Sequence, residues 1–210
     1  MALPFSTDPI GIVMATSWEA QPLLKAFGFT RIDYRLYRGE SRGQPMVVCV
    51  TGVGKKNARA GADRLCSLGI KALVSAGFCG ALVPELRVGD LVTEGLITVD
   101  VPARNRAERD ALTEKTKPVA VDMETQAVVE AGTLYGIPIY ALRVVSDELD
   151  DDLTPLFGAD RAFTPWKIAL RLLNPRVWPL ASQLKRNSDA ASRRLIAEVD
   201  AFLQKNAAHH

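Results

Sequence analysis

Three carboxylates of this sequence, Glu19, Glu124 and Asp147, follow predicted strands and are placed to do acid–base chemistry. An ionised carboxylate accepts hydrogen bonds and activates a nucleophile, whereas a protonated one donates a proton to a leaving group. The two histidines, His209 and His210, are the last two residues, which argues against a histidine triad or a histidine metal site. Any acid–base catalysis by this chain therefore falls to carboxylates.

Residues 119–147 predict the elements that position two of these acids. Val119–Val121 is a short apolar run typical of a strand, and Asp122 and Glu124 follow it directly. A helix comes next and ends near Gly136. The apolar face of this helix consists of Met123, Ala127, Ala131, Leu134 and Tyr135.

A second strand follows that helix. Ile137–Val145 is apolar except for Arg143 and is long enough to cross a buried parallel sheet, and Ser146 and Asp147 come after it. In open α/β sheets, ligands bind at the carboxyl ends of the strands. We therefore expect Asp147 to lie at the same edge as the acids that follow Val121.

The remaining elements predict an α/β protein, with a central twisted mixed sheet flanked by helices. Strands are expected at Ile10–Ala15 and Ala72–Ala76, and a hairpin from Tyr34–Ser41 and Met46–Thr51. Helices are expected at residues 17–27, 55–68 and 188–203. The apolar face of the last helix consists of Ala191, Leu195, Val199 and Phe202. With 210 residues, we expect a single domain, residues 1–210.

Two glycine-rich turns follow predicted strands, at Thr51–Gly54 and Gly77–Gly80. The first is not a phosphate-binding Walker loop, because the first glycine of that motif is missing and Lys56 stands where Ser or Thr is needed. Glycine turns at strand ends are usually only turns. Two of them at one predicted edge indicate backbone contacts with a ligand, and Thr51, Gly52 and Gly77 are candidates for it.

Composition sets outer limits on function. Three cysteines without a CxxC spacing suit a reduced, cytoplasmic protein and argue against a zinc site or a disulfide framework. The net charge of +2 does not indicate nucleic-acid binding, and we expect none. We also expect no metal and no cofactor. No segment has the length of a membrane span, and the first residues lack a signal-peptide pattern.

The candidate site residues lie in short motifs that follow one another along the chain. Glu19 follows the first strand, and then come TGVGK, AGFCGAL, VGD, VDMET and RVVSD. In that order the chain resembles the purine nucleoside phosphorylase and nucleosidase superfamily over residues 10–150. The resemblance implies a nucleoside phosphorylase-like three-layer fold and cleavage of the N-glycosidic bond of a nucleoside.

The methylthioadenosine/S-adenosylhomocysteine nucleosidase branch implies roles for the matched residues. By this resemblance Glu19 activates the attacking water, Met123 and Glu124 hold the ribose, and Asp147 protonates N7 of the purine. Such a division fits an oxocarbenium-like transition state, which needs a proton donor at the base and a nucleophile at the sugar. Phe78 and Ser146 join the candidate substrate-binding residues because they lie beside matched motifs.

Each acid also has a purely structural interpretation. Thr16 and Glu19 fit a capping box, which by itself is the favoured interpretation until the resemblance is considered. Asp147 fits a cap or turn residue, and Glu124 a carboxylate stabilised by a helix dipole. Asp122 is interpreted as a cap or structural acid.

Two departures from the family pattern bear on the nucleophile and the base. Ser75 and Thr16–Trp18 stand where hexameric bacterial phosphorylases place phosphate-binding arginines, so phosphate and water both stay open as nucleophile. Gly11, Thr51 and Gly52 are left as candidate donors to phosphate. The connection Leu91–Val121 is shorter than is usual in the family, and it offers no identifiable residue to stack on the base.

The segment 161–186 is basic and aromatic, with six Lys or Arg residues and no Asp or Glu. It resembles the end of hopanoid-associated nucleoside phosphorylases, which implies an adenosylhopane-like substrate, a nucleoside with a lipid at the ribose 5′ position. Lys167 and Arg171 share one face of a predicted helix. The opposite face holds Trp166, Ala169, Leu170 and Leu173. This pattern predicts weak peripheral contact with the inner face of a membrane, and an ordinary packed helical hairpin is an equally weighted interpretation.

The alternatives are a soluble methylthioadenosine/S-adenosylhomocysteine-type nucleosidase, a futalosine hydrolase, or a non-catalytic purine-binding module. Retention of all three acids argues against the last. By family resemblance we also expect a homodimer.

Overall fold

The computed structural model describes residues 8–158 and 170–207 of the chain. The strands in this part are β1 (Ile10–Met14), β2 (Thr30–Asp33), β3 (Leu36–Ser41), β4 (Gln44–Val50), β5 (Ala72–Ala81), β6 (Leu91–Val92), β7 (Leu96–Thr98), β8 (Ala120–Asp122) and β9 (Ile139–Asp147). The helices are α1 (Ser17–Ala26), α2 (Lys55–Cys66), α3 (Arg106–Thr116), α4 (Thr125–Tyr135), α5 (Thr154–Phe157), the short 3-10 helix η1 (Pro175–Val177) and α7 (Trp178–Ala207).

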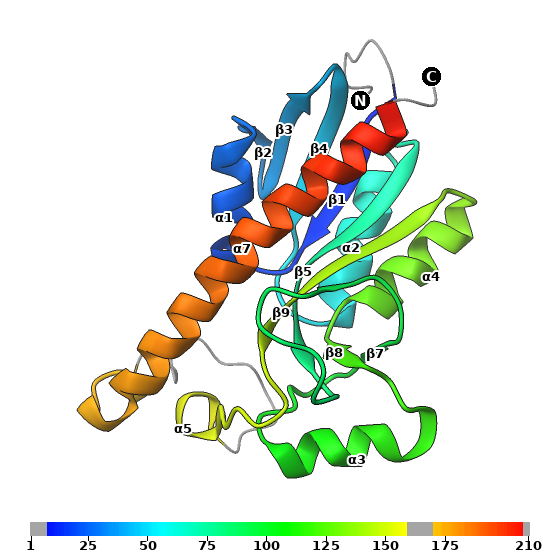
Figure 1. Ribbon diagram of the computed structural model, residues 1–210. Coiled ribbons are helices and arrows are strands. Elements are labelled where there is room, and N and C mark those ends of the chain that lie inside the picture. The colour runs from blue at the N-terminus through cyan, green and yellow to red at the C-terminus, as the bar shows by residue number, and fades with distance from the viewer. Residues whose placement is uncertain (1–7, 159–169, 208–210) are drawn as a thin grey trace.

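The described strands form one mixed sheet in the order β2-β3-β4-β1-β5-β8-β7, and β9 pairs with both β5 and β6. The central strands β4, β1, β5 and β9 run parallel to one another. Helices α1 and α7 cover one face of this sheet, and α2 and α4 cover the other (Figure 1). The expected three-layer α/β fold is thus confirmed.

Alternation along the strands explains why both faces are covered, because successive side chains of a strand point to opposite faces. Ile12 of β1 packs in the cluster with α1 and α7, and the next residue, Val13, packs in the cluster with α2 and α4. The predicted apolar face of the last helix is also found, since Ala191, Leu195 and Val199 are buried in the first cluster and Phe202 packs against it. That helix is longer than predicted, because it begins at Trp178 rather than at residue 188.

The central segment differs from the prediction in the helix face. Helix α4 begins at Thr125, so Met123 precedes it, and Leu134 and Tyr135 are exposed at its end, Leu134 by 71%. The face that α4 buries consists of Thr125, Ala127, Val128, Ala131 and Gly132. The prediction is confirmed for Ala127 and Ala131 and wrong at both ends of the stripe, because Met123 precedes the helix and its last two residues are exposed.

The glycine-rich segment Gly77–Gly80 is a second correction. It is not a turn but the second half of β5, which pairs with β9 through Gly80 and with β8 at Gly80 and Ala81. The register with β9 shifts between Cys79 and Gly80, so that Gly80 pairs with Asp147. Strand β9 likewise runs to Asp147, so Ser146 and Asp147 are the last residues of a strand rather than the residues after it.

The connection between residues 91 and 121 holds more structure than the sequence indicated. It contains β6, β7 and the eleven-residue helix α3. Residues 159–169, which include Trp166, Lys167 and Ala169 of the predicted amphipathic helix, lie outside the described residues. No helix in the described part of the chain combines the length and the apolar character needed to cross a bilayer.

Candidate active site

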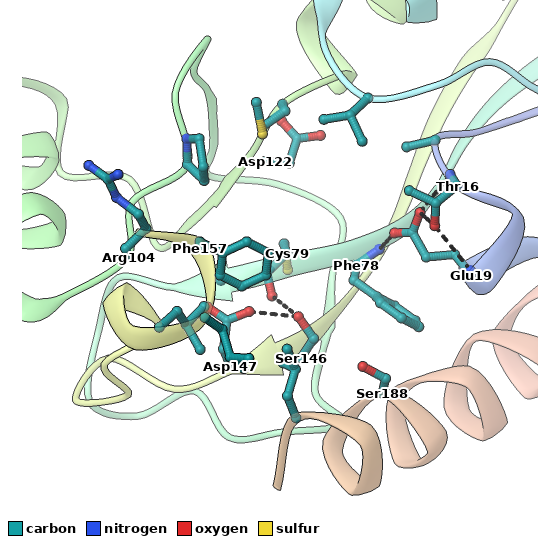
Figure 2. Close-up of a pocket in the computed structure, with 18 of the residues that line it drawn as sticks. Thr16, Glu19, Phe78, Cys79, Arg104, Asp122, Ser146, Asp147, Phe157 and Ser188 are labelled. Atoms are coloured by element: carbon teal, nitrogen blue, oxygen red, sulfur yellow. Dashed lines mark hydrogen bonds between the residues drawn. The ribbon is translucent and has the colours of Figure 1, made fainter. Parts of the chain in front are cut away.

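A cavity of about 620 Å³ opens at the carboxyl ends of the parallel strands. Its size falls within the range of roughly 300–1,000 Å³ that is usual for small-molecule sites. Glu19 and Asp147 lie at opposite sides of it, with Phe78 between them and Asp122 above (Figure 2). Predicted site residues that line the cavity are Glu19, Phe78, Met123, Glu124, Ser146 and Asp147. The expected edge of the sheet is therefore where the acids gather.

Glu19 makes the predicted capping box and also lines the cavity. Its Oε2 accepts hydrogen bonds from Thr16 N, at 3.0 Å, and from Thr16 Oγ1, at 2.8 Å, while its own N–H donates to Thr16 Oγ1. Its other oxygen, Oε1, accepts from Phe78 N at 3.0 Å. The cap thus fixes the carboxylate at the cavity wall, so the structural and the functional interpretation of Glu19 are compatible.

Two glycines of β5 make room for the acids. A Cβ atom at Gly77 would lie 2.8 Å from Arg143 Nη1 and 3.1 Å from Glu19 Oε1, and the backbone there has φ of +153°. A Cβ atom at Gly80 would lie 2.7 Å from Asp147 Oδ2. Real Cβ atoms do not approach polar atoms this closely without displacing them. Gly77 does not line the cavity itself, and its contribution is this free space.

Arg143 is fully buried beneath the cavity and binds two acids. Its guanidinium lies 3.1 Å from Asp122 Oδ2 and 3.5 Å from Glu124 Oε2. It also donates to Ser75 Oγ at 2.8 Å and to Thr125 Oγ1 at 3.0 Å. The sequence analysis did not predict this ion pair. A charged residue in an otherwise apolar strand is a signal that could have indicated it, because arginine is rarely buried without a partner.

Asp122 fulfils the structural interpretation. Its Oδ2 accepts from the backbone N–H of Thr125 at 2.9 Å and from the hydroxyl of the same residue, and its Oδ1 accepts from Thr98 Oγ1 at 2.6 Å. With Arg143 as well, its acceptor positions are used within the protein. Asp122 therefore joins β7, β8 and the start of α4.

Glu124 lies beside that network and faces the cavity. Its Oε1 accepts from Gly54 N at 2.9 Å, which ties it to the start of α2. Burial raises the pKa of Glu124, and the charge of Arg143 and the Gly54 N–H oppose that rise. Glu124 is the residue before the first turn of α4, but its side chain makes no cap bond there, and its hydrogen bond goes to the start of α2 instead.

Asp147 is buried at the end of β9. Its Oδ2 lies 2.5 Å from Arg109 Nη2, and its Oδ1 accepts from Ser146 Oγ at 2.7 Å. Burial raises the pKa of Asp147, while the charge of Arg109 and the bond from Ser146 oppose the rise. Arg109 comes from α3, and no motif in the sequence indicated it.

Three predicted donors lie elsewhere. The backbone N–H of Thr51 donates to Met14 O and that of Gly52 donates to Ala15 O, both as part of the extension of β4 along β1. Gly11 lies in the middle of β1, where it pairs with β4 and β5. Neither Thr51 nor Gly52 lines the cavity in the part of the chain that the structure describes.

One wall of the cavity, on the side of α5 and α7, is apolar, and the sequence analysis did not predict it. This far wall is formed by residues around α5, by the segment before α7 and by α7 itself, namely Leu153, Leu156, Phe157, Leu172, Ala181 and Leu184. Arg104 of the same wall donates to Glu108 and to Gly158 O. Lys185 is at the cavity too, but its side chain is 70% exposed and is paired with Asp189.

Within residues 8–158 and 170–207, no cluster of three or more His, Cys, Asp or Glu side chains has the arrangement of a metal site. Cys49, Cys66 and Cys79 are all free thiols. Cys79 lines the cavity, and burial raises the pKa of its thiol, so the group is neutral there.

The sequence of this chain matches a known protein family. A model of the phosphorylase superfamily matches residues 9–93 and 96–166. The uridine phosphorylase of Escherichia coli K12 is 32% identical over 106 residues, which are 50% of this chain and 40% of that protein. A guanosine phosphorylase of Halorubrum lacusprofundi is 30% identical over 60 residues, which are 29% of this chain and 25% of that protein. The aligned parts thus span less than half the length of these relatives.

Solved structures resemble the chain over nearly its whole length. The 5′-methylthioadenosine/S-adenosylhomocysteine nucleosidase of Helicobacter pylori has a TM-score of 0.68 at 18% identity, covering 92% of this chain and 98% of that one. The futalosine hydrolase of the same species has a TM-score of 0.69 at 18% identity, with the same coverage. The 5′-methylthioadenosine nucleosidase of Arabidopsis thaliana has a TM-score of 0.70 at 17% identity, covering 94% of this chain and 95% of that one. At these identities the likeness establishes the fold.

Proposed function

The chain belongs to the phosphorylase superfamily, and from that premise we propose that it cleaves the N-glycosidic bond of a 5′-substituted adenosine and releases adenine. The observation that carries this proposal is the placement of Asp147 and Glu19 at opposite sides of one cavity (Figure 2). Glu124 lines the same cavity, where burial raises its pKa, and it lies close enough to Glu19 for the charge of Glu19 to raise that pKa further. A departing base needs a proton on one side of the bond, and the sugar needs a nucleophile on the other.

Asp147 is the proton donor in this mechanism. The direction of its pKa supports the role, because a carboxyl group whose pKa is raised by burial holds a proton at higher pH than an exposed one. As the C1′–N bond breaks, its electron pair goes to the base, and the proton of Asp147 goes to a ring nitrogen. The family resemblance makes that nitrogen N7 of a purine.

Glu19 and Glu124 serve the sugar. Glu19 takes a proton from the attacking molecule, and Glu124 accepts hydrogen bonds from the ribose hydroxyls. Arg143 lies beside both carboxylates, and its charge favours the ionised form of Glu124. The negative charge of the carboxylates then stabilises the positive charge that develops on the sugar ring. Met123, which lines the same wall, packs against the ribose.

Water is the nucleophile that this environment favours. Phosphate would have to approach Glu19 and Glu124, and like charges at short range repel strongly in a buried site. Arg143 is engaged with the acids, and the backbone N–H groups of Thr51 and Gly52 are bonded to β1. The sequence left both water and phosphate open as the nucleophile. We therefore propose water.

The apolar far wall supports an apolar 5′ substituent such as the lipid of an adenosylhopane-like nucleoside. Among the described lining residues, cations are few. Arg104 is held by Glu108, and Lys185 is exposed and paired. Four lining carboxylates outnumber them, namely Glu19, Asp122, Glu124 and Asp147. An anionic substrate would therefore meet few cations in this lining, which disfavours nucleotides and other anionic substrates.

Membrane contact is the related proposal for the segment before and at the start of α7. Leu173 and Trp178 are exposed by 76% and 56%, and residues 170–186 carry no Asp or Glu. Arg176, which lies between Leu173 and Trp178 in the sequence, is exposed, and so is Arg186, two turns further along α7. Apolar side chains flanked by cations suit the surface of an anionic bilayer. Leu172 joins this surface to the cavity wall, so a lipid-bearing nucleoside would enter from it.

One part of the membrane prediction is wrong. Arg171 was expected on an outward polar face, but its guanidinium donates to the carbonyl oxygens of Leu156 and Phe157. It fastens α5 to the segment that precedes α7, because these carbonyls belong to the last residues of that short helix. A test of membrane binding must therefore change Arg176 and Arg186 instead.

The experiment that tests the proposed function is release of free base, measured by chromatography with and without phosphate. The panel consists of 5′-methylthioadenosine, adenosine with a long 5′-alkylthio chain, futalosine, guanosine and uridine. We expect adenine from the first two, faster from the long-chain compound, and no need for phosphate. Release from uridine alone would replace the adenosine assignment, and release from none would favour a purine-binding module. A homodimer and a cytoplasmic location remain predictions, and light scattering checks the first.

A further inference from the structure

Arg109 is a fully buried arginine outside the cavity whose side chain reaches the proton donor. Nη2 lies 2.5 Å from Asp147 Oδ2, and Nη1 donates to Ala81 O at 3.2 Å and also to Glu148 O. These carbonyls belong to the last residue of β5 and to the residue after β9. In Figure 1, α3 lies at the end of the sheet toward which the parallel strands run. The side chain of Arg109 therefore reaches Asp147 from α3, outside the cavity.

The hydrogen-bonding chemistry of arginine favours one oxygen of Asp147 as the site of the proton. A guanidinium has only donors, so Oδ2, which it contacts, acts as an acceptor. A carbonyl oxygen accepts more strongly than the hydroxyl oxygen of a carboxylic acid, so this contact favours the form with the proton on Oδ1. Ser146 tolerates a proton on Oδ1, because its hydroxyl can accept from Oδ1 and turn its own hydrogen toward Cys79 O, which lies 3.4 Å away.

The charges around Asp147 give Arg109 a second effect. Arg109 is the cation that faces it from α3, Asp151 is an acid that raises its pKa from the loop after β9, and Cys79 on β5 is neutral. Burial raises the pKa of Asp147, which favours the protonated form that the reaction needs at its start. When the proton leaves, a buried carboxylate forms, and an adjacent cation stabilises it.

We propose that Arg109 is a positioning residue for the proton donor. It favours the proton on Oδ1 of Asp147 and stabilises the carboxylate that forms as the base departs. In that step the Oδ1–H bond breaks, an N–H bond forms on the base, and the electron pair of the C1′–N bond moves into the base. This inference rests on the proposed function, in which Asp147 is the acid.

The competing role for Arg109 is that of a structural pin, a residue that only holds the ends of β5 and β9 together through its bonds to Ala81 O and Glu148 O. The two roles separate on a substrate whose leaving group needs no proton. The probe is 4-nitrophenyl β-D-ribofuranoside, since nitrophenolate departs as an anion, and the comparison substrate is 5′-methylthioadenosine. The variants are Arg109→Met, Arg109→Lys and Asp147→Asn. The matched control is Arg106→Met, an arginine of the same helix that bonds to Asp110 and Asp150 at the surface.

In Arg109→Met we expect kcat on the nucleoside to fall by about tenfold or more, because general acid catalysis contributes about 10²–10⁴-fold and is weakened rather than removed. KM and the rate on the nitrophenyl riboside should change by less than about threefold. The alkaline limb of the kcat profile should move to higher pH, because the main cationic influence that lowers the pKa of Asp147 is gone. Combined with Asp147→Asn, the same change should add less than about threefold.

Several outcomes would overturn the inference. Equal slowing of both substrates with an unmoved alkaline limb would leave Arg109 as a structural pin. Full additivity with Asp147→Asn would show that Arg109 does not act through that acid. If Arg109→Met does not fold, Arg109→Lys decides, since it keeps a cation and loses the paired donors. An unchanged ratio of the two substrate rates in that variant would refute the inference. Wild-type protein that cleaves neither substrate would refute the proposed function instead.

Discussion

Asp147→Asn is the substitution that bears most directly on the proposed mechanism. Asparagine keeps the shape of the side chain and an oxygen that accepts from Arg109, but it has no proton to give. Loss of a general acid should lower turnover by about 10²-fold or more, which corresponds to about 2.7 kcal/mol in the activation free energy. The comparison substrate is 5′-methylthioadenosine, with adenine release followed by chromatography.

The same substitution also affects stability, and the two effects must be separated. Removing one charge of a buried ion pair costs about 3–5 kcal/mol. Asp147 carries that charge only when it is ionised, and asparagine retains an acceptor for Arg109, so this variant lies at the lower end. A loss of about 3 kcal/mol lowers the melting temperature by roughly 6–12 °C in a chain of this size. Turnover is therefore measured well below that transition. Asp150→Asn is the control, since Asp150 is an exposed acid three residues away that bonds to Arg106.

The dependence of turnover on pH tests directly whether Asp147 is the proton donor. The active form of Asp147 is protonated, and its pKa is raised by burial, so activity should persist below the raised pKa and fall as pH rises through it. The Asn variant should lack this alkaline limb. Wild-type turnover in Asp147→Asn, or an alkaline limb that remains unchanged, would refute the assignment of Asp147 as proton donor.

Further predictions concern the sugar side, the strand glycine, the nucleophile and the membrane. Glu19→Gln should lower kcat by about 10²-fold with a small change in melting temperature, and full activity would leave Glu19 as a cap alone. Gly80→Ala should displace Asp147 and lower kcat by about 10²-fold, measured beside a crystal structure of the variant. Adenine release should be independent of added phosphate, and ribose 1-phosphate as product would contradict this. Cosedimentation with anionic vesicles should be weak, salt-sensitive and reduced by Arg176→Glu plus Arg186→Glu; protein that stays in the supernatant at low salt would exclude the membrane proposal.

The strands and helices nearest the site could be predicted because their signals are local. The apolar run before Asp122, the capping box at Glu19 and the apolar stripe of the last helix each lie within a few residues of chain. Such patterns predicted which edge of the sheet would gather the acids. They could not show that Gly77–Gly80 continues β5, because only the pairing with β9 and β8, from distant parts of the chain, distinguishes this stretch from a turn.

The sequence by itself therefore determined the family, the fold and the acids that face the cavity, since side-chain type and position along an element carry that information. Tertiary structure alone decided the partners of those acids. Arg109 lies 38 residues before Asp147 and reaches it only because α3 packs behind the ends of β5 and β9. Arg171 turns inward for a similar reason, as the carbonyls of α5 lie within its reach. Hydrogen bonds and charges act over a few ångströms in space, and no local pattern records which distant segments come that close.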